Sequence, residues 1–240
     1  MINNWKKNTI YISLMQFILL SVNFFLITII SRVYGAEMYG EYASSKSLSV
    51  LIGTAAVMSL ALVVTKFLAQ KNKSSKLMFQ NAYALILRNL LISLIFLIPL
   101  TLFLKRDLPM TILFLIGFVF NEMIHVALAY YQAKGDFVTS SKQIILRTII
   151  YGLGAWILVM QGFSILSLII FQVITLLIFF AVAHFSIPKN DIDLNSNTTV
   201  KNDLQASGKK MVLTTFSSAL ISELDIVLLG LFYSGSTLGV

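Results

Sequence analysis

The chain has 240 residues, of which 58% are apolar and 12% are charged, and its formal net charge is +8. A soluble domain carries roughly twice that share of charged residues, so the composition excludes an ordinary soluble protein. Because the chain has no Cys, disulfides, thiol catalysis and Cys-based metal sites are excluded as well. The basic residues lie in short loops between apolar runs, which is typical of membrane topology and not of nucleic-acid binding.

The first uncharged run covers residues 9–31 and predicts an uncleaved transmembrane helix. At about 1.5 Å per residue, this run is long enough to cross a hydrocarbon core of about 30 Å. The preceding Lys6 and Lys7 resemble the start of a signal peptide, but no small-residue cleavage site follows the run. The helix ends at a break, residues 32–42, where charges, glycines and tyrosines indicate a membrane–water interface.

The rest of the chain repeats this plan. Six more apolar runs predict helices at 47–65, 77–104, 108–131, 144–160, 163–185 and 211–233. We therefore expect an all-α integral membrane protein with about seven transmembrane helices. Its expected parts are an N-terminal six-helix transmembrane bundle at 1–187, a cytoplasmic linker at 188–209, and the first helix of a truncated second bundle at 210–240. The linker is rich in Asn, Asp and Lys, a composition typical of mobile segments.

Lys and Arg are distributed unevenly between alternate loops, and this predicts the orientation. Most of the 18 basic residues fall on the side of the N-terminus, which leaves on the other side only Arg32, Lys46, Lys105 and Arg106. By the positive-inside rule the N-terminus is cytoplasmic. Seven spans would then place the C-terminus outside.

A short internal similarity explains the odd number of spans. Residues 34–40 read Y-G-A-E-M-Y-G, and residues 233–239 read Y-S-G-S-T-L-G. Each segment follows a long apolar helix that itself follows a basic segment. We interpret the seventh span as the first helix of a second copy, and in transporters with internal repeats the substrate site lies between the copies.

Two motifs resemble those of Wzx-type polysaccharide flippases, which belong to the multidrug/oligosaccharidyl-lipid/polysaccharide exporter superfamily. The first has the form R-x-x-G-x-x-x-Y-G-x-Y and consists of Arg32, Gly35, Tyr39, Gly40 and Tyr42. The second is an Asp near the middle of helix seven that precedes an apolar run with a Gly, here Asp225 and Gly230. The resemblance covers essentially the whole chain and about half of the family's length, its N-terminal half.

The resemblance implies a multi-pass transporter of the bacterial inner membrane. Its substrate would be an undecaprenyl-pyrophosphate-linked oligosaccharide, which is flipped to the outer leaflet for O-antigen or other lipopolysaccharide biosynthesis. No cofactor, nucleic-acid partner or enzymatic activity is expected. The expected partners are the lipid bilayer, a polysaccharide polymerase complex and a second half-length chain, and a truncated chain is expected to be inactive if it acts alone.

The substrate-binding candidates are the cations that would offset the pyrophosphate charge in a polar cavity, namely Arg88, Arg147, Arg32 and Lys46. Arg88 lies well inside the third predicted helix, where it either lines the cavity or extends to the interface. Arg147 is closer to the predicted start of its helix, and extension to the interface is the favoured interpretation there.

The ion- or proton-coupling candidates are Glu122, His125, Glu223 and Asp225. Glu122 and His125 are three residues apart and share a helix face, so they either relay protons or form a buried polar contact. Glu223 and Asp225 point in different directions, which argues against a joint metal site, and no metal site is expected elsewhere. Asp225 occupies the family's position and is the better candidate for a bundle interface.

Other polar residues in the spans leave alternatives open. Ser13, Gln16 and Asn23 face either a cavity or a neighbouring helix, and His184 is expected at the membrane interface. Two other functions remain in view: a drug or cation antiporter of the same superfamily, and a membrane accessory protein without transport activity. Arg88 and Arg147 argue against export of cationic drugs.

Overall fold

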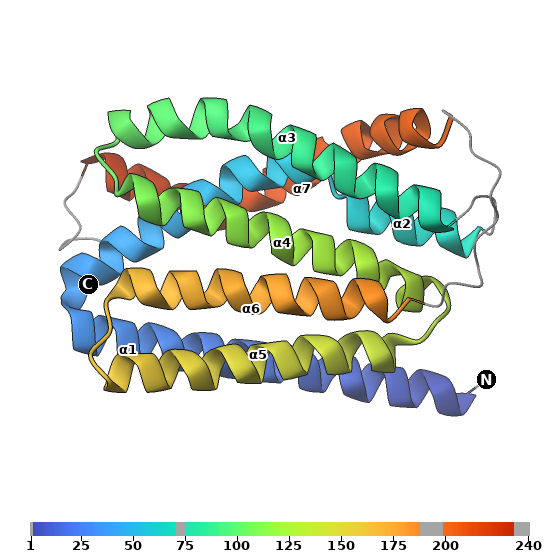
Figure 1. The fold of residues 1–240 in the computed structure, drawn as a ribbon, viewed down its shortest axis with the longest axis horizontal. Helices are drawn as coiled ribbons and strands as arrows, with labels where there is room; N and C mark the ends of the chain where they lie inside the picture. The colour runs from blue at the N-terminus through green and yellow to red at the C-terminus, as the bar shows by residue number, and fades with distance from the viewer. Residues whose placement is uncertain (1, 71–74, 188–198, 233–240) are drawn as a thin grey trace.

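Seven α-helices make up the described part of the chain in the computed structural model, which covers residues 2–70, 75–187 and 199–232. The helices are α1 (Ile2–Val57), α2 (Leu60–Ala69), α3 (Ser75–Phe103), α4 (Leu108–Ala133), α5 (Phe137–Met160), α6 (Ile165–Phe185) and α7 (Thr199–Phe232). They lie roughly along one direction (Figure 1). All secondary structure in these residues is helical, which confirms the all-α class.

Five helical stretches in the described residues are long and apolar enough to cross a membrane. They are Trp5–Ala69, Met78–Phe103, Leu108–Ala133, Phe137–Met160 and Ile165–Phe185. The last four correspond to the third to sixth spans expected from the sequence, whereas α7, at the position of the expected seventh span, is not among the five. The first has 65 residues and would extend about 100 Å if it were straight, far more than a hydrocarbon core of about 30 Å.

A reversal at Gly35 explains the length of the first stretch. Gly35 is the residue inside α1 with a non-helical backbone, with φ 85° and ψ 167°. The chain runs from the N-terminus to the opposite end of the bundle and then returns toward α2 (Figure 1). The break predicted at 32–42 is therefore concentrated at one glycine, and the first stretch contains the first two expected spans.

We expect Gly35→Ala to destabilise the fold by about 1–3 kcal/mol, because only glycine adopts this backbone conformation without strain. A Cβ atom at Gly35 would meet nothing within 4 Å, so the effect would come from strain and not from a clash. The measurement is thermal unfolding in detergent, with Gly117→Ala as the control. A Cβ at Gly117 would make ordinary contacts, the nearest at 3.5 Å. Equal melting temperatures for the two variants would contradict the prediction.

The second expected span, 47–65, is not one continuous helix. Helix α1 ends at Val57, Met58 and Ser59 both have a φ of 51°, and α2 begins at Leu60. Side chains from other helices support this interruption. Asn89 of α3 donates its amide N–H to the carbonyl oxygen of Ala56 at 2.8 Å, and Ser59 donates to Thr215 of α7 at 2.9 Å.

Helix α7 begins at Thr199, inside the segment 188–209 that the sequence analysis assigned to a linker. This early start has a physical cause, since Leu204 is fully buried and packs in the core beside α2, α3 and α4. The helix contacts α1, α2 and α3. The remainder of the expected linker, 188–198, and the segment 233–239 of the internal similarity lie outside the described residues.

Helix α4 occupies the centre of the bundle and contacts α1, α2, α3, α5 and α6. About half of its residues are buried, including Leu115, Val126 and Leu128. Its N-terminus is capped by Asp107, which accepts a hydrogen bond from the backbone N–H of Met110 at 2.7 Å. Polar side chains on α4 are consequently held inside the protein.

Polar contacts hold the end of the bundle at which α1 reverses. The carboxylate of Glu41 forms an ion pair with Arg106 at 2.9 Å and accepts a hydrogen bond from the backbone N–H of Asp107 at 2.7 Å. The hydroxyl of Tyr34 donates to the carbonyl oxygen of Phe163 at 2.6 Å. Together these contacts connect the reversal to the α3–α4 and α5–α6 connections.

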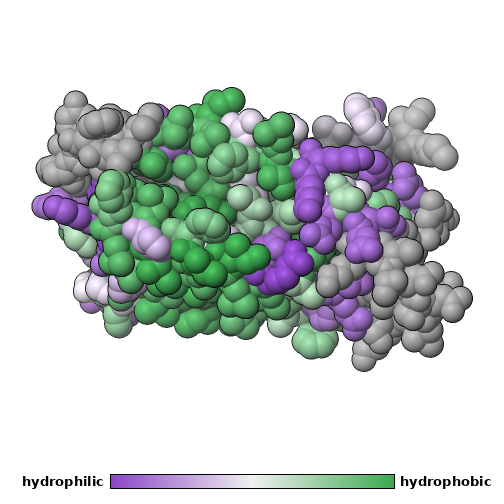
Figure 2. Space-filling model, turned by 90° about the horizontal axis from the view of Figure 1, so that it is seen from above, coloured by the Kyte–Doolittle hydropathy of each residue, from purple (hydrophilic) through white to green (hydrophobic). Residues whose placement is uncertain are grey.

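The outer surface is strongly apolar. On α3 alone, large side chains such as Phe96 and Phe103 are 67% and 78% exposed. In the face shown in Figure 2, apolar residues cover most of the middle and the area left of centre, and hydrophilic residues gather toward the right, the end that holds the N-terminus in Figure 1. A soluble protein does not expose so large an apolar area. The described structure is therefore that of a multi-pass membrane protein.

Candidate functional site: a polar cavity between four helices

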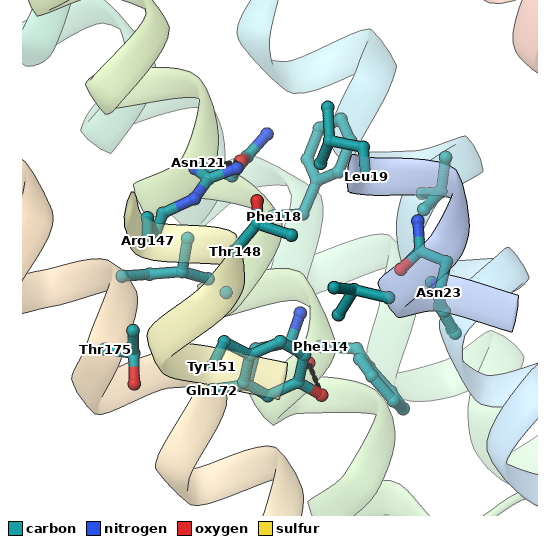
Figure 3. Close-up of a pocket in the computed structure, with 15 residues that line it drawn as sticks. Leu19, Asn23, Phe114, Phe118, Asn121, Arg147, Thr148, Tyr151, Gln172 and Thr175 are labelled. Carbon is teal, nitrogen blue, oxygen red and sulfur yellow. Dashed lines mark hydrogen bonds between the residues drawn. The ribbon is translucent and has the colours of Figure 1, made fainter. Parts of the chain in front are cut away.

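A cavity of about 290 Å³ lies between α1, α4, α5 and α6 (Figure 3). Its lining includes the apolar rings of Phe114 and Phe118. It also includes eight polar or charged side chains from the same four helices: Asn23, Lys46, Asn121, Arg147, Thr148, Tyr151, Gln172 and Thr175. So many polar groups within apolar helices are costly unless they contact one another, water or a ligand.

Arg147 lies deep in the bundle and not near the start of its helix. Helix α5 begins at Phe137, not at residue 144 as expected. Arg147 therefore lies about 15 Å from the start of α5, measured along the helix axis. Asp136 caps the helix and accepts a hydrogen bond from the backbone N–H of Thr139 at 3.1 Å. The favoured interpretation, extension to the interface, is wrong, because the guanidinium of Arg147 donates to Oδ1 of Asn121 at 2.7 Å.

Arg147 on α5 and the pair Glu122 and His125 on α4 are far apart in the sequence, but the structure brings Arg147 and Glu122 together. The amide of Asn121 donates to the carboxylate of Glu122 at 3.4 Å, and Asn121 also accepts from Arg147. Asn121 therefore connects Arg147 of α5 to Glu122 of α4. Asn121 lines the cavity, whereas Glu122 and His125 are not among its lining residues.

A second polar pair lies one helical turn further along α5. The hydroxyl of Tyr151 is 3.4 Å from Oε1 of Gln172 on α6, at the long end of hydrogen-bond distances. The sequence analysis named neither residue, and it also missed Asn121. Tyr151 and Gln172 are single polar or partly polar residues within apolar runs, and Asn121 directly precedes Glu122. Intramembrane polar residues are themselves a signal of function.

The remaining cationic candidates differ in their positions. Lys46 lines the cavity. Arg88 does not; it is exposed, and its guanidinium donates to the side chain of Asn89 at 3.1 Å. Arg32 is also exposed and lies near the reversal at Gly35. Only Arg147 and Lys46, of the four substrate-binding candidates, belong to the cavity.

The two acids of α7 point in different directions, as their spacing predicts. Ser47 of α1 donates a hydrogen bond to the half-buried carboxylate of Glu223 at 2.5 Å. Asp225 is exposed, and its carboxylate accepts from the backbone N–H of Ile226 at 2.8 Å. In the described residues, no group of three or more acidic or His side chains could hold a metal ion.

The structure also places the other polar residues that were named from the sequence, three on α1 and one on α6. Asn23 lines the cavity, whereas Ser13 and Gln16 are exposed on α1. His184, near the end of α6, packs in an aromatic cluster, with its ring centroid 5.6 Å from that of Tyr83 and 6.0 Å from that of Phe180. Of these three polar residues on the first helix, Asn23 is therefore the one that lines the cavity.

The fold and the cavity define a multi-pass helical membrane protein with a cationic, polar site between its helices. The chain belongs to the polysaccharide biosynthesis protein family, whose model matches residues 64–240, more than half of the chain. The match covers most of the cavity wall but not the motif at 32–42. No curated protein and no solved structure matched the chain.

Proposed function

We propose that this chain moves lipid-linked oligosaccharides across the bacterial cytoplasmic membrane for surface polysaccharide biosynthesis. The observation that carries this proposal is the position of Arg147, a cation held deep in an apolar bundle and facing a polar cavity. A pyrophosphate crossing a hydrocarbon core needs such a site, because a charged group transferred into an apolar medium is strongly destabilised. Arg also offers paired N–H donors to phosphate oxygens.

The lipid tail of such a substrate stays in the bilayer while the head group crosses. Membership of the polysaccharide biosynthesis family supports a substrate of this class. The excess of Lys and Arg on the N-terminal side supports a cytoplasmic N-terminus. Asn121 connects Glu122 to Arg147, and His125 shares a helix face with Glu122. These two residues are proposed as the groups through which an ion or proton couples to substrate binding.

The cavity is smaller than the whole substrate. Its volume of about 290 Å³ is at the lower limit of pockets for drug-sized ligands, about 300–1,000 Å³. An oligosaccharide of several sugars would need additional space. We propose that a second bundle, such as that of a second copy of the chain, supplies the other wall of a larger passage, and that the two bundles move relative to each other.

Export of cationic drugs is disfavoured by the lining. The charged side chains that the structure describes around the cavity are Arg147 and Lys46, both cationic. A cation in this cavity would be repelled, whereas an anionic head group would be attracted.

The test is complementation of a bacterial strain whose own flippase gene is deleted. The chain is expressed with a tag, its presence in the membrane is verified, and polymer on the cell surface is scored. Restored polymer would support the proposal. Absence of polymer, while a flippase with known specificity for that strain restores it, would favour a non-transporting membrane accessory protein.

A further inference from the structure

The polar lining of the cavity is divided into two ends. Arg147 and Tyr151 are four residues apart on α5, so they share a face and differ by about 6 Å along the helix axis. Arg147 contacts Asn121 of α4, and Tyr151 contacts Gln172 of α6. Figure 3 shows these two pairs at different ends of the pocket, with Thr148 between them.

The two ends differ in their chemistry. The end with Arg147 has a positive charge and suits an anion. At the other end, the pair of Tyr151 and Gln172 is neutral, and the amide of Gln172 lines the cavity. The hydroxyl groups of Tyr151 and Thr175 donate to Gln172 and to the carbonyl oxygen of Phe171, so their oxygens are left to accept hydrogen bonds from a ligand. The contact with Tyr151 uses the amide oxygen of Gln172 and leaves the amide N–H groups to donate to a ligand oxygen.

Such a neutral pair suits a sugar ring. A pyranose carries hydroxyl groups around an apolar framework, so it needs hydrogen-bonding groups together with an apolar wall. The ring of Phe114 lies beside the Tyr151–Gln172 pair in Figure 3 and supplies that wall. The volume of about 290 Å³ leaves room for a small ligand and not for a long oligosaccharide.

We propose that the cavity binds one phosphate-linked sugar, and that Gln172 determines specificity for this sugar. The anionic group binds at Arg147, and the first sugar attached to it contacts Gln172, which Tyr151 holds in place. This inference rests on the proposed function, since the ligand is the carrier-proximal part of the lipid-linked oligosaccharide. The chemistry is shared with a soluble sugar phosphate, so the experiment must distinguish the two sources.

The experiment measures ligand binding by the tagged chain in nanodiscs. The probes are bare undecaprenyl pyrophosphate, the same carrier with N-acetylglucosamine or with galactose attached, and the two corresponding soluble sugar 1-phosphates. For the wild-type chain, we expect at least one sugar-bearing carrier to bind about five- to tenfold more tightly than the bare carrier. The soluble phosphates are expected to bind more weakly than the carrier-linked sugar.

Three variants separate the contributions of Gln172 and Tyr151 to binding of the sugar. Gln172→Leu is expected to lose the additional affinity that the sugar confers, while its affinity for the bare carrier stays within about twofold of wild type. Tyr151→Phe, which keeps the ring and removes only the hydroxyl, is expected to lose part of the gain. Gln16→Leu is the control, because Gln16 is an exposed glutamine on α1 that does not line the cavity.

The outcomes distinguish this inference from the proposed function. If the wild-type chain binds the bare carrier but neither sugar adds affinity, or if Gln172→Leu keeps the full gain, the specificity role of Gln172 is overturned and the flippase proposal stands. If the wild-type chain binds no carrier-linked probe, the proposed function fails as well. Tighter binding of a soluble sugar phosphate would overturn the lipid-linked source.

Discussion

Arg147→Ala is expected to weaken binding of undecaprenyl pyrophosphate by about 10- to 100-fold. A hydrogen bond to a charged group contributes about 1.5–3 kcal/mol, and about 1.4 kcal/mol corresponds to a tenfold change in affinity. The guanidinium of Arg147 faces the cavity and is positioned by Asn121 at 2.7 Å. Arg147→Lys keeps the charge but loses the paired N–H donors, so we expect an intermediate affinity. The measurement is a binding titration with the chain in nanodiscs.

Arg88→Ala is the matched control for this prediction. Arg88 is also an Arg within a membrane-spanning helix, but it is exposed and does not line the cavity. Its replacement should leave the affinity for undecaprenyl pyrophosphate within about twofold of wild type. Equal losses of affinity in Arg147→Ala and Arg88→Ala would show that any positive charge in the membrane-spanning helices promotes binding. The cavity would then not be the anion site.

Gly152→Val is expected to lower stability by about 1–3 kcal/mol or more, because it overpacks the contact between α1 and α5. A Cβ atom on Gly152 would lie 2.7 Å from Cγ1 of Val22, closer than two carbon atoms can approach. Small residues commonly allow such close approach of helices in membranes. Because Val22 also lines the cavity, the separation of the helices would distort the site. The measurement is the thermal unfolding temperature in detergent.

A compensating substitution tests whether the effect comes from this contact. In Gly152→Val combined with Val22→Ala, the space vacated by the Val22 side chain accommodates part of the new one. The double variant should therefore recover a large part of the lost stability, as expected for two residues in contact. Additive losses would mean that Gly152 is required for another reason, such as the conformation of α5 itself.

Composition and run length predicted the fold class, since a mean hydropathy of +0.86 and long uncharged runs leave few alternatives. The ends of the helices were harder to predict. The first two turns of α5 and the first three of α7 are largely polar, so hydropathy alone assigned residues 137–143 and 199–209 to loops. The Asp136 cap marks the true start of α5, and the burial of Leu204 extends α7.

The site was predicted only in part, because a sequence does not show which helix faces meet. Arg147, Lys46 and Asn23 were named in advance and line the cavity, whereas Arg88 and Arg32 do not. The contributions of Asn121, Tyr151 and Gln172 depend on α4, α5 and α6 packing side by side. A single polar residue in an apolar run marks a candidate, and its role follows only when its partner on another helix is known.

The hydrogen bond between Ser47 and Glu223 has a consequence for how the protein is made. Helix α6 contains no Asp, Glu, Lys or Arg, so it can partition into the bilayer unaided. Helix α7 carries Glu223 and Asp225, and an acidic residue at the centre of a helix costs about 2.5–3.5 kcal/mol on insertion scales. Ser47 on α1 is synthesised long before α7. We expect the nascent α7 to enter the membrane against helices that are already in place, so that assembly of the bundle precedes the integration of this helix.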